Sequence, residues 1–392
     1  MRQPMRVGCL ALLILGWQTL ASAQDGAKHN GRGAIGAICE SQPNGSCRIR
    51  SVVKDGPANQ AGLRTDDTLL RVRGETTGSV TEQIGKTTPG THAIIEFQRG
   101  DDRKQIPVTI GDELALYSQA AEAGDPSAQT TLGEIYVWRH GVAKSATSGM
   151  NWLRKAADAG DSAAQTDLGN IYLNGQGVPR DDNTAAWWFR KAADRGDPNG
   201  EYSLAFMYTE GRGLPKDPKL AFEWYTKAAE QGHAQAQWTV GWHYEHGVVV
   251  EKNLQTAAQW YRKAADQGLP EAEAHLGSMY FDGIGLQKDD AMALKLFRRA
   301  ADNKQAEAQF GLGVMYQYGR GVPKSEATAL SWYGKAAAQN DPAAEYFIGM
   351  MYENGTGAAK NLNTAIDWYK KAAAHGNQAA AAKLQQLQTE KH

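Results

Sequence analysis

The stretch AQTDLGNIYLNGQGVPRDDNTAAWWFRKAADRG at residues 164–196 decides the fold, because its pattern recurs at a fixed interval along most of the chain. The small residue Gly169 of this stretch has a counterpart every 36 residues, without an insertion. The series consists of Gly133, Gly169, Ala205, Gly241, Gly277, Gly313 and Gly349. Seven copies therefore run from about residue 125 to 376. A strict period of this length predicts a solenoid, whose units must stack to bury their apolar faces.

Each copy has the pattern of two helices. In the first half, Ala164, Leu168 and Tyr172 recur at i, i+4 and i+8, which is the apolar stripe of an amphipathic helix. The second half has a similar stripe that includes Trp188. A small residue such as Gly169 lets two helices approach closely, and we expect Trp188 and Tyr172 to fill the space beside it.

The residues between and after the two helices indicate where each helix begins and ends. Gly175 and Gly177 supply the positive φ that a turn requires. Asp181 or Asn183 can cap the start of the second helix. Gly196 fits a left-handed residue at its end. Other copies have Gly124, Gly160, Gly232, Gly268, Asn340 and Gly376 in this place, and Lys304 is the exception.

The full pattern A-x-x-x-L-G-x-x-Y-x-x-G-x-G-V-x-x-[DN]-x-x-x-A-x-x-W-x-x-K-A-A-x-x-G closely resembles the Sel-one-like repeat, a relative of the tetratricopeptide repeat. The resemblance covers roughly two thirds of the chain. It implies a mainly α protein, an α/α superhelical solenoid of seven 36-residue helix-turn-helix repeats. Such a solenoid is expected to act as a protein-binding scaffold, often in a bacterial envelope, and the resemblance specifies no partner.

Residues 1–23 have the layout of a secretory signal peptide. Arg2 and Arg6 precede an apolar run from Val7 to Trp17, and small residues precede Gln24. We expect cleavage after Ala23 and a periplasmic or secreted mature protein. The alternative, a membrane anchor, is disfavoured because the run is shorter than the ~20 residues that a span needs. Residues 24–31 are polar and are predicted to form a linker.

The cysteines agree with export. The chain has three, and removal of Cys9 with the signal peptide leaves Cys39 and Cys47. In an oxidising compartment we favour a disulfide between these two over a pair of free thiols. A C-x7-C spacing is a poor metal signature, and no metal or other cofactor is predicted.

Residues 32–110 change from a helical to a strand pattern. Five segments are predicted strands: 35–39, 47–53, 68–74, 91–99 and 104–110, with a short helix at 79–87. Together with the run GPANQAGLRTDDTLLRVRG at 56–74, this order resembles a bacterial PDZ domain. The fold class is therefore a solenoid preceded by a small, mainly β, PDZ-like domain.

The PDZ resemblance implies a peptide-binding site. In that family a loop donates backbone N–H groups to a ligand's C-terminal carboxylate, and the following strand pairs with the peptide. The positions that match are Gly33, Ala34, Ile35, Gly36 and Ala37 in the loop, Ile38 in the strand, and Val80 and Ile84 in the side-chain pocket. The alternative is that the PDZ fold serves only for docking or capping.

Two segments are predicted to cap the solenoid. Residues 111–124 resemble the second helix of an incomplete repeat and would cover the edge of the first full copy. Residues 377–392 form an alanine- and glutamine-rich helix and a charged tail that would close the other end.

Charge and motifs exclude several functions. The formal net charge is −1, and Lys and Arg form no basic stripe, so nucleic-acid binding is not expected. Catalytic motifs are missing, and the chain is not predicted to be an enzyme. A histidine pair, His243 and His246, lacks a third metal ligand at matching spacing.

These observations favour an exported scaffold or adaptor, with the PDZ-like unit holding a C-terminus or partner edge and the concave solenoid surface holding a second protein. A secreted effector or host-binding protein is the first alternative. An enzyme directed at cell-wall substrates, or a β-lactam-binding protein, is the second. Residues 48–392 contain no cysteine, unlike the cysteine-rich relatives linked to β-lactams, which weakens the second alternative.

Overall fold

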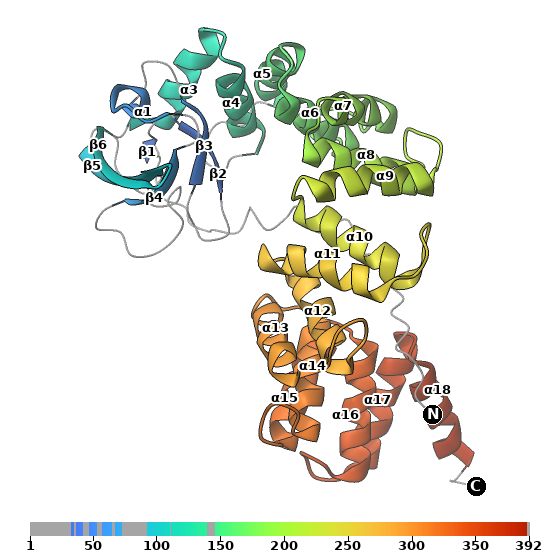
Figure 1. Cartoon of the computed structure of the whole chain (residues 1–392). Coiled ribbons are helices and arrows are strands. Elements are labelled where there is room, and N and C mark those ends of the chain that lie inside the picture. The colour runs from blue at the N-terminus through green and yellow to red at the C-terminus, as the bar shows by residue number, and fades with distance from the viewer. Residues whose placement is uncertain are drawn as a thin grey trace. The chain divides into compact units, whose positions relative to one another are not determined.

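The computed structural model describes residues 33–34, 37–41, 47–52, 57–64, 67–72, 92–109, 111–138 and 146–389. These residues divide into two compact units, a strand-rich unit that ends at Leu116 and a helical unit from Tyr117 onward (Figure 1).

The strand-rich unit contains a five-stranded antiparallel sheet with the order β2-β3-β4-β5-β6. Its strands are β2 (Ala37–Ser41), β3 (Cys47–Val52), β4 (Thr68–Val72), β5 (His92–Arg99) and β6 (Asp102–Thr109). A short pair joins β1 (Gly33–Ala34) to β7 (Gly111–Asp112), and the helix α1 spans Pro57–Gln60. Strand β2 lies at one edge of the five-stranded sheet, so within the described residues its outer side has no neighbouring strand.

Alternating side chains of the sheet form the core of this unit. Ile95 and Phe97, two residues apart on β5, are both buried. Asp67, also buried, accepts two hydrogen bonds of 2.7 Å from the guanidinium of Arg99. A buried carboxylate needs such a bidentate partner. Asp67 thereby ties the loop after Leu63 to the end of β5.

The helical unit consists of helix pairs that follow one another in chain order (Figure 1). The first helices of the seven repeats are α4 (Pro126–Trp138), α6 (Ser162–Asn174), α8 (Pro198–Glu210), α10 (Ala234–His246), α12 (Pro270–Asp282), α14 (Ala306–Tyr318) and α16 (Pro342–Asn354). The second helices are α5 (Ala146–Asp158), α7 (Asp182–Asp194), α9 (Pro218–Glu230), α11 (Leu254–Asp266), α13 (Asp290–Asp302), α15 (Glu326–Ala337) and α17 (Leu362–Ala374). Helix α3 (Glu113–Glu122) precedes them and α18 (Gln378–Thr389) follows. This architecture confirms the predicted fold class.

The helix ends follow the predicted chemistry. The carboxylate of Asp181 accepts hydrogen bonds from the backbone N–H groups of Asn183 and Thr184, which caps α7. Gly196 has φ +78°, in the left-handed region. Lys304 adopts the same geometry, with φ +62°, although it carries a side chain. The repeat therefore imposes this backbone conformation even where the sequence lacks glycine.

The recurring glycine faces an aromatic ring of the second helix in five repeats and Leu153 in the first repeat. A Cβ added to Gly169 would lie 2.4 Å from the ring of Phe189, and one added to Gly313 would lie 2.4 Å from the ring of Tyr333. Such distances leave no room for a side chain unless the ring moves. Trp188 is buried beside this crossing as predicted, in one cluster with Leu168, Ile171 and Tyr172. The next residue, Phe189, occupies the crossing itself.

Spacing between neighbouring repeats shows which helices line the inner side of the stack. Helix α6 closely approaches α8, and α12 closely approaches α14, whereas consecutive second helices within the described residues stay farther apart. In a curved stack the helices on the inner side are the closer ones. The first helices therefore form the inner layer of the solenoid. Among the described helices, none has the length and apolar character required to cross a bilayer.

Candidate functional site

The structure describes the predicted peptide-binding strand but only part of the predicted loop. Ala37 and Ile38 begin β2, the edge strand of the five-stranded sheet. An edge strand presents the backbone N–H and C=O groups that an added peptide strand would pair with. Gly33 and Ala34 form β1, which pairs with β7. The other predicted residues, Ile35, Gly36, Val80 and Ile84, lie outside the described residues.

The two cysteines lie on neighbouring strands. In the β2–β3 register, Cys39 is opposite Ile49, and Cys47 is opposite Ser41. The cysteines are therefore diagonal neighbours, and diagonal positions are farther apart than directly opposite ones. The disulfide stays a prediction.

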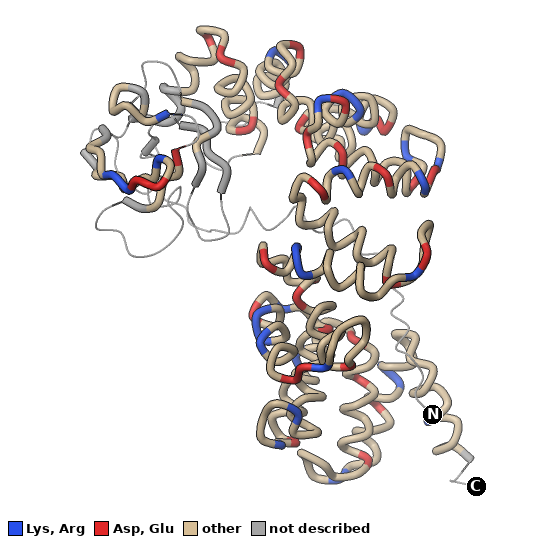
Figure 2. The backbone as a smooth tube through the Cα atoms, viewed as in Figure 1, with Lys and Arg blue, Asp and Glu red and all other residues tan. Residues whose placement is uncertain are grey.

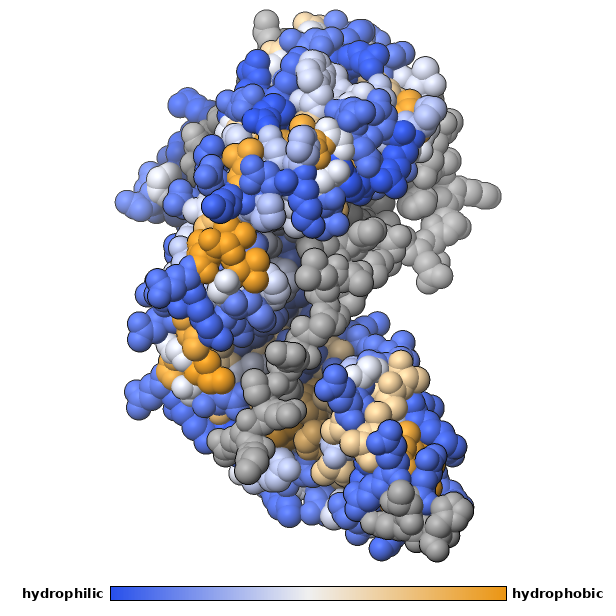
Figure 3. All heavy atoms as spheres, turned by 90° about the vertical axis from the view of Figure 1, so that its right-hand side faces the viewer, coloured by the Kyte–Doolittle hydropathy of each residue, from blue (hydrophilic) through white to orange (hydrophobic). Residues whose placement is uncertain are grey.

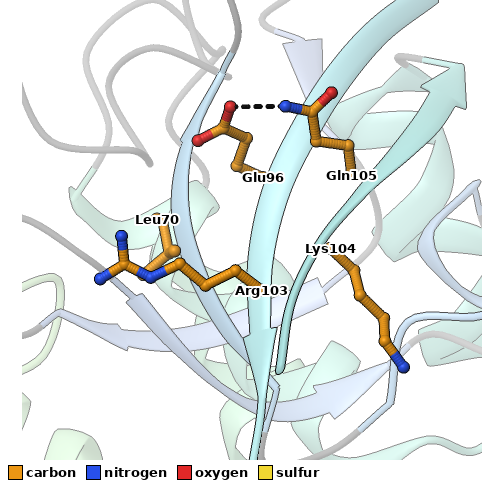
Figure 4. Close-up of a pocket in the computed structure, with 5 residues that line it drawn as sticks. All are labelled: Leu70, Glu96, Arg103, Lys104 and Gln105. Atoms are coloured by element: carbon orange, nitrogen blue, oxygen red, sulfur yellow. Dashed lines mark hydrogen bonds between the residues drawn. The ribbon is translucent and has the colours of Figure 1, made fainter. Parts of the chain in front are cut away.

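A shallow polar pocket of about 360 Å³ lies elsewhere on the sheet, where Leu70, Glu96, Arg103, Lys104 and Gln105 line it. Figure 4 shows Glu96 and Gln105 side by side, joined by a hydrogen bond of 2.8 Å, while Lys104 points away from them. These residues come from β4, β5 and β6, and in the sheet β3 lies between β2 and these strands. The pocket is therefore separate from the predicted peptide-binding edge.

On the inner layer of the solenoid, some side chains vary from repeat to repeat while others stay constant. We call the second, sixth, ninth and thirteenth residues of each first helix the inner stripe, because spacings of four, three and four residues place them on one helical face. At the ninth position the seven repeats have Glu134, Asn170, Phe206, Trp242, Ser278, Val314 and Met350. The third position, by contrast, is alanine or glycine in every copy. The inner stripe therefore differs from repeat to repeat on a constant framework.

A buried polar ladder holds neighbouring repeats together beside this stripe. The fourth residue of each first helix is Gln or Glu, and all seven are buried: Gln129, Gln165, Glu201, Gln237, Glu273, Gln309 and Glu345. The Gln165 side chain donates to the carbonyl of Ala157 in the preceding repeat, at 3.0 Å. Glu201 instead accepts from the side-chain amide of Gln231, at 2.7 Å. These contacts give each of the two buried side chains a hydrogen-bond partner, although the Oε1 atom of Gln165 stays buried without one. This position therefore serves the packing of the solenoid.

A charged cluster of the inner layer surrounds His275 on α12. Its Nδ1 lies 3.6 Å from a carboxylate oxygen of Glu245 on α10, and its Nε2 lies 3.8 Å from one of Glu307 on α14. The ring stacks on Tyr261, with ring centroids 5.1 Å apart, and the Tyr261 hydroxyl donates to Glu245 at 2.6 Å. Four elements of three consecutive repeats therefore meet at one histidine.

The electrostatics of the cluster favour a charged histidine. Burial alone would lower the pKa of His275, but Glu307 and Glu245 raise it to about 9. Burial would raise the pKa of Glu245, but His275 and Tyr261 lower it to about 2. The imidazolium and its carboxylates therefore stabilise one another around neutral pH, and the cluster acts as an ionic joint between repeats.

Two further histidines, His243 and His246 on α10, form hydrogen bonds within their own repeat. His243 Nδ1 lies 2.9 Å from the carbonyl of Val248, and His246 Nδ1 lies 2.9 Å from that of Trp242. The His246 ring also stacks on Trp242, with centroids 4.3 Å apart. The described residues contain no group of three or more His, Cys, Asp or Glu side chains suited to a metal ion.

The apolar side chains that remain exposed lie in separate groups. The large ones of the helical unit are Trp187, Val248, Val249, Ile284, Tyr318 and Leu362. In Figure 3 apolar residues form separate orange groups within a hydrophilic surface. Of the extra aromatic residues in the sequence, Trp187 is 51% exposed while its neighbour Trp188 is buried.

Sequence reasoning did not find the His275 cluster. From one member to the next along the chain, the separations are 14 to 32 residues, and the members come from different repeat positions, so no local motif joins them. A signal was nevertheless present, since His275 stands at a position where no other repeat has a histidine.

Family models match both units. The model for the Sel1 repeat matches residues 114–125, 126–161, 162–197, 198–233, 234–269, 270–304, 306–341 and 342–377. The model for the PDZ domain matches residues 33–110. These matches confirm the two resemblances that the motifs suggested.

Two solved structures resemble the helical unit. A protective antigen of uropathogenic Escherichia coli with an SLR fold is 37% identical, with a TM-score of 0.62, over 72% of this chain and 61% of that chain. A Sel1 repeat protein from Oxalobacter formigenes is 35% identical, with a TM-score of 0.51, over 70% of this chain and 79% of that chain.

A curated relative is more distant. A probable periplasmic serine endoprotease, DegP-like, from Halomonas elongata is 30% identical over 95 residues, which is 24% of this chain. The present chain spans about a fifth of the length of that relative, since the match covers 20% of it.

Proposed function

This chain belongs to the Sel1 repeat family and contains a PDZ domain, and from that premise we propose that it is an exported scaffold that holds two protein partners. The observation that carries the proposal is the inner stripe, where side chains vary between repeats while the packing positions stay constant. The stripe also lies on the side where neighbouring first helices approach one another, so a single partner segment can contact several repeats at once.

The PDZ domain supplies the second proposed site. A partner's C-terminal segment would add to the edge strand β2, with Gly33, Ala34, Ile35, Gly36 and Ala37 donating backbone N–H groups to its carboxylate. Ile38 would pair with the peptide, and Val80 and Ile84 would contact its last side chain. The position of β2 at the sheet edge supports this arrangement.

Export is part of the proposal. The basic and apolar pattern of residues 1–23 and the pair Cys39 and Cys47 support a periplasmic or secreted protein with a disulfide. The similarity to a relative named as periplasmic agrees with this location.

Site-specific photocrosslinking in cells tests the scaffold. A photoreactive amino acid replaces Glu210, an exposed residue of the inner stripe, or Ile38 on β2; the control position is Glu223, an exposed residue of the second helix α9. We expect discrete protein crosslinks from 210 and from 38, and few from 223.

Replacement of Ile35 and Gly36 should remove the crosslinks from 38 and leave those from 210. Equal crosslinking from all three positions, or from 223 alone, would contradict the proposed inner surface.

A further inference from the structure

Charged residues are segregated between the two layers of the solenoid. The seven first helices, each 13 residues long, contain no Lys or Arg at all. Every second helix contains at least one (Figure 2). Because a random placement of the chain's 42 Lys and Arg residues would put several in the first helices, the inner layer specifically lacks them.

The inner layer does carry acidic residues, and most of those outside the buried ladder lie on the inner stripe. They are Glu134, Asp167, Glu210, Glu271, Asp282 and Glu307. Within the described residues, Asp167, Glu210, Glu271 and Asp282 form no ion pair with Lys or Arg. On the stripe itself, the positively charged side chain is His275, which contacts Glu307.

Unpaired buried polar atoms also lie on this face. On α6, Asp167 and Asn170 are three residues apart and so share a side of the helix. Asn170 is 9% exposed, and its side-chain Nδ2 has no hydrogen-bond partner among the described residues. The Oδ2 atom of Asp167 is likewise buried without a partner. Burial and the neighbouring Glu134, which hydrogen-bonds to it, raise the pKa of Asp167 well above its usual range, so this carboxyl is not a free anion. The Asn170 side chain therefore supplies the donor that a ligand would complete.

Aromatic side chains also lie on the stripe. Phe206 and Trp242 occupy the ninth position in consecutive repeats, and Phe347 occupies the sixth position of α16. All three are half-buried. Acidic groups beside aromatic rings bind the charged end and the aliphatic stem of Lys or Arg at the same time.

We propose that the inner stripe binds an extended protein segment in which Lys or Arg alternates with apolar residues. This inference rests on the proposed scaffold function and specifies the chemistry of one partner. The ammonium or guanidinium groups pair with Glu210, Glu271 and Asp282, and a backbone carbonyl of the segment accepts from Asn170. An acidic segment is repelled by the same carboxylates, so the stripe selects by charge.

The experiment uses the full chain and two fluorescent 12-residue peptides, one with Lys at alternate positions among Leu and Ser, the other with Glu in place of Lys. Fluorescence anisotropy measures binding at low and high salt. We expect binding of the Lys peptide only, with affinity that falls at least tenfold between about 50 and 500 mM salt because the charges are screened.

Matched variants distinguish an effect of the stripe's own carboxylates from an effect of the protein's overall charge. Glu271→Lys with Asp282→Lys reverses two stripe residues, and Asp266→Lys with Asp302→Lys makes the same charge change at exposed ends of second helices. The first pair should weaken the Lys peptide at least tenfold and the second less than twofold, with unchanged circular dichroism in both.

Equal weakening by both pairs, or equal binding of the two peptides, overturns the inference. If the Lys peptide fails to bind while position 210 still crosslinks to a protein in cells, the scaffold stands and the partner's basic character is refuted.

Discussion

The first and second helices of each repeat share one packing scheme but differ on their outward faces. In six of the seven second helices, a Lys ammonium lies 3.6 to 4.2 Å from the ring centroid of a nearby Trp. The exception has Leu296 in the Trp place, and its Arg299 pairs with Glu273. The inner stripe of the first helices follows no such rule.

This difference teaches how one repeat can serve two purposes. The outer layer repeats the same cation–π pair, which stabilises each helix locally and holds the cations away from the inner face. The inner layer keeps its packing residues constant and changes the rest. Variation within a single chain therefore separates positions that hold the solenoid together from positions available for binding.

The largest expected effect comes from removing a constant packing residue. Phe189→Ala on α7 leaves a cavity where a fully buried ring stood, and should lower the free energy of unfolding by about 3–5 kcal/mol. Trp187→Ala on the same helix removes an exposed ring and should cost less than about 1 kcal/mol. Urea unfolding followed by circular dichroism measures both. Similar losses for the two variants would break the distinction between packing and exposed positions.

An intermediate effect is expected at the ionic joint of the inner layer. The folded-state pKa of His275, about 9, lies above its unfolded value of about 6.5. The stabilisation that the charged His275 contributes is therefore fully present below pH 6.5 and is lost as the pH rises through 9. His275→Gln should cost about 2 kcal/mol at pH 6 and much less at pH 9.5.

The measurement for His275→Gln is the urea midpoint at the two pH values. His246→Gln is the matched control, because His246 is exposed on the neighbouring first helix. A loss for His275→Gln that is the same at pH 6 and 9.5 would show that the ring acts by packing alone.

The smallest effect is expected on the outer layer. Lys263 Nζ lies 3.9 Å from the centroid of Trp260. Lys263→Gln removes the cation and should cost about 0.5 kcal/mol at an exposed site. Thermal unfolding compares it with Lys252→Gln, which removes a loop lysine. If the two variants lose equal stability, the recurring Lys–Trp pair has no stabilising role of its own.

The sequence predicted the helical unit well because its signal is repeated seven times. Helix pairs, turn glycines and the cap at Asp181 all follow from local chemistry that each copy restates. The sequence also placed Trp188 beside the helix crossing, where it is buried. It did not single out Phe189 as the ring that contacts the recurring small residue, because that position holds Leu, Phe or Tyr in different repeats and so is less regular than the Trp position.

The candidate site was harder to predict. Lys and Arg are dispersed along the linear sequence. Their absence from the inner layer depends on where each helix begins and ends and on which helices face inward. The His275 cluster depends on contacts between three repeats, which no single 36-residue unit contains. In the PDZ domain, the sequence resemblance named the peptide-binding residues, and the structure adds that the strand starting at Ala37 lies at a sheet edge.

The uninterrupted 36-residue spacing has a genetic consequence. Because every interface between neighbouring units uses the same positions, unequal recombination between two copies would delete or duplicate a whole unit and leave a chain that still stacks. The binding face could then lengthen or shorten in equal steps, and shuffling of units would create new orders of side chains along it without redesign of the scaffold.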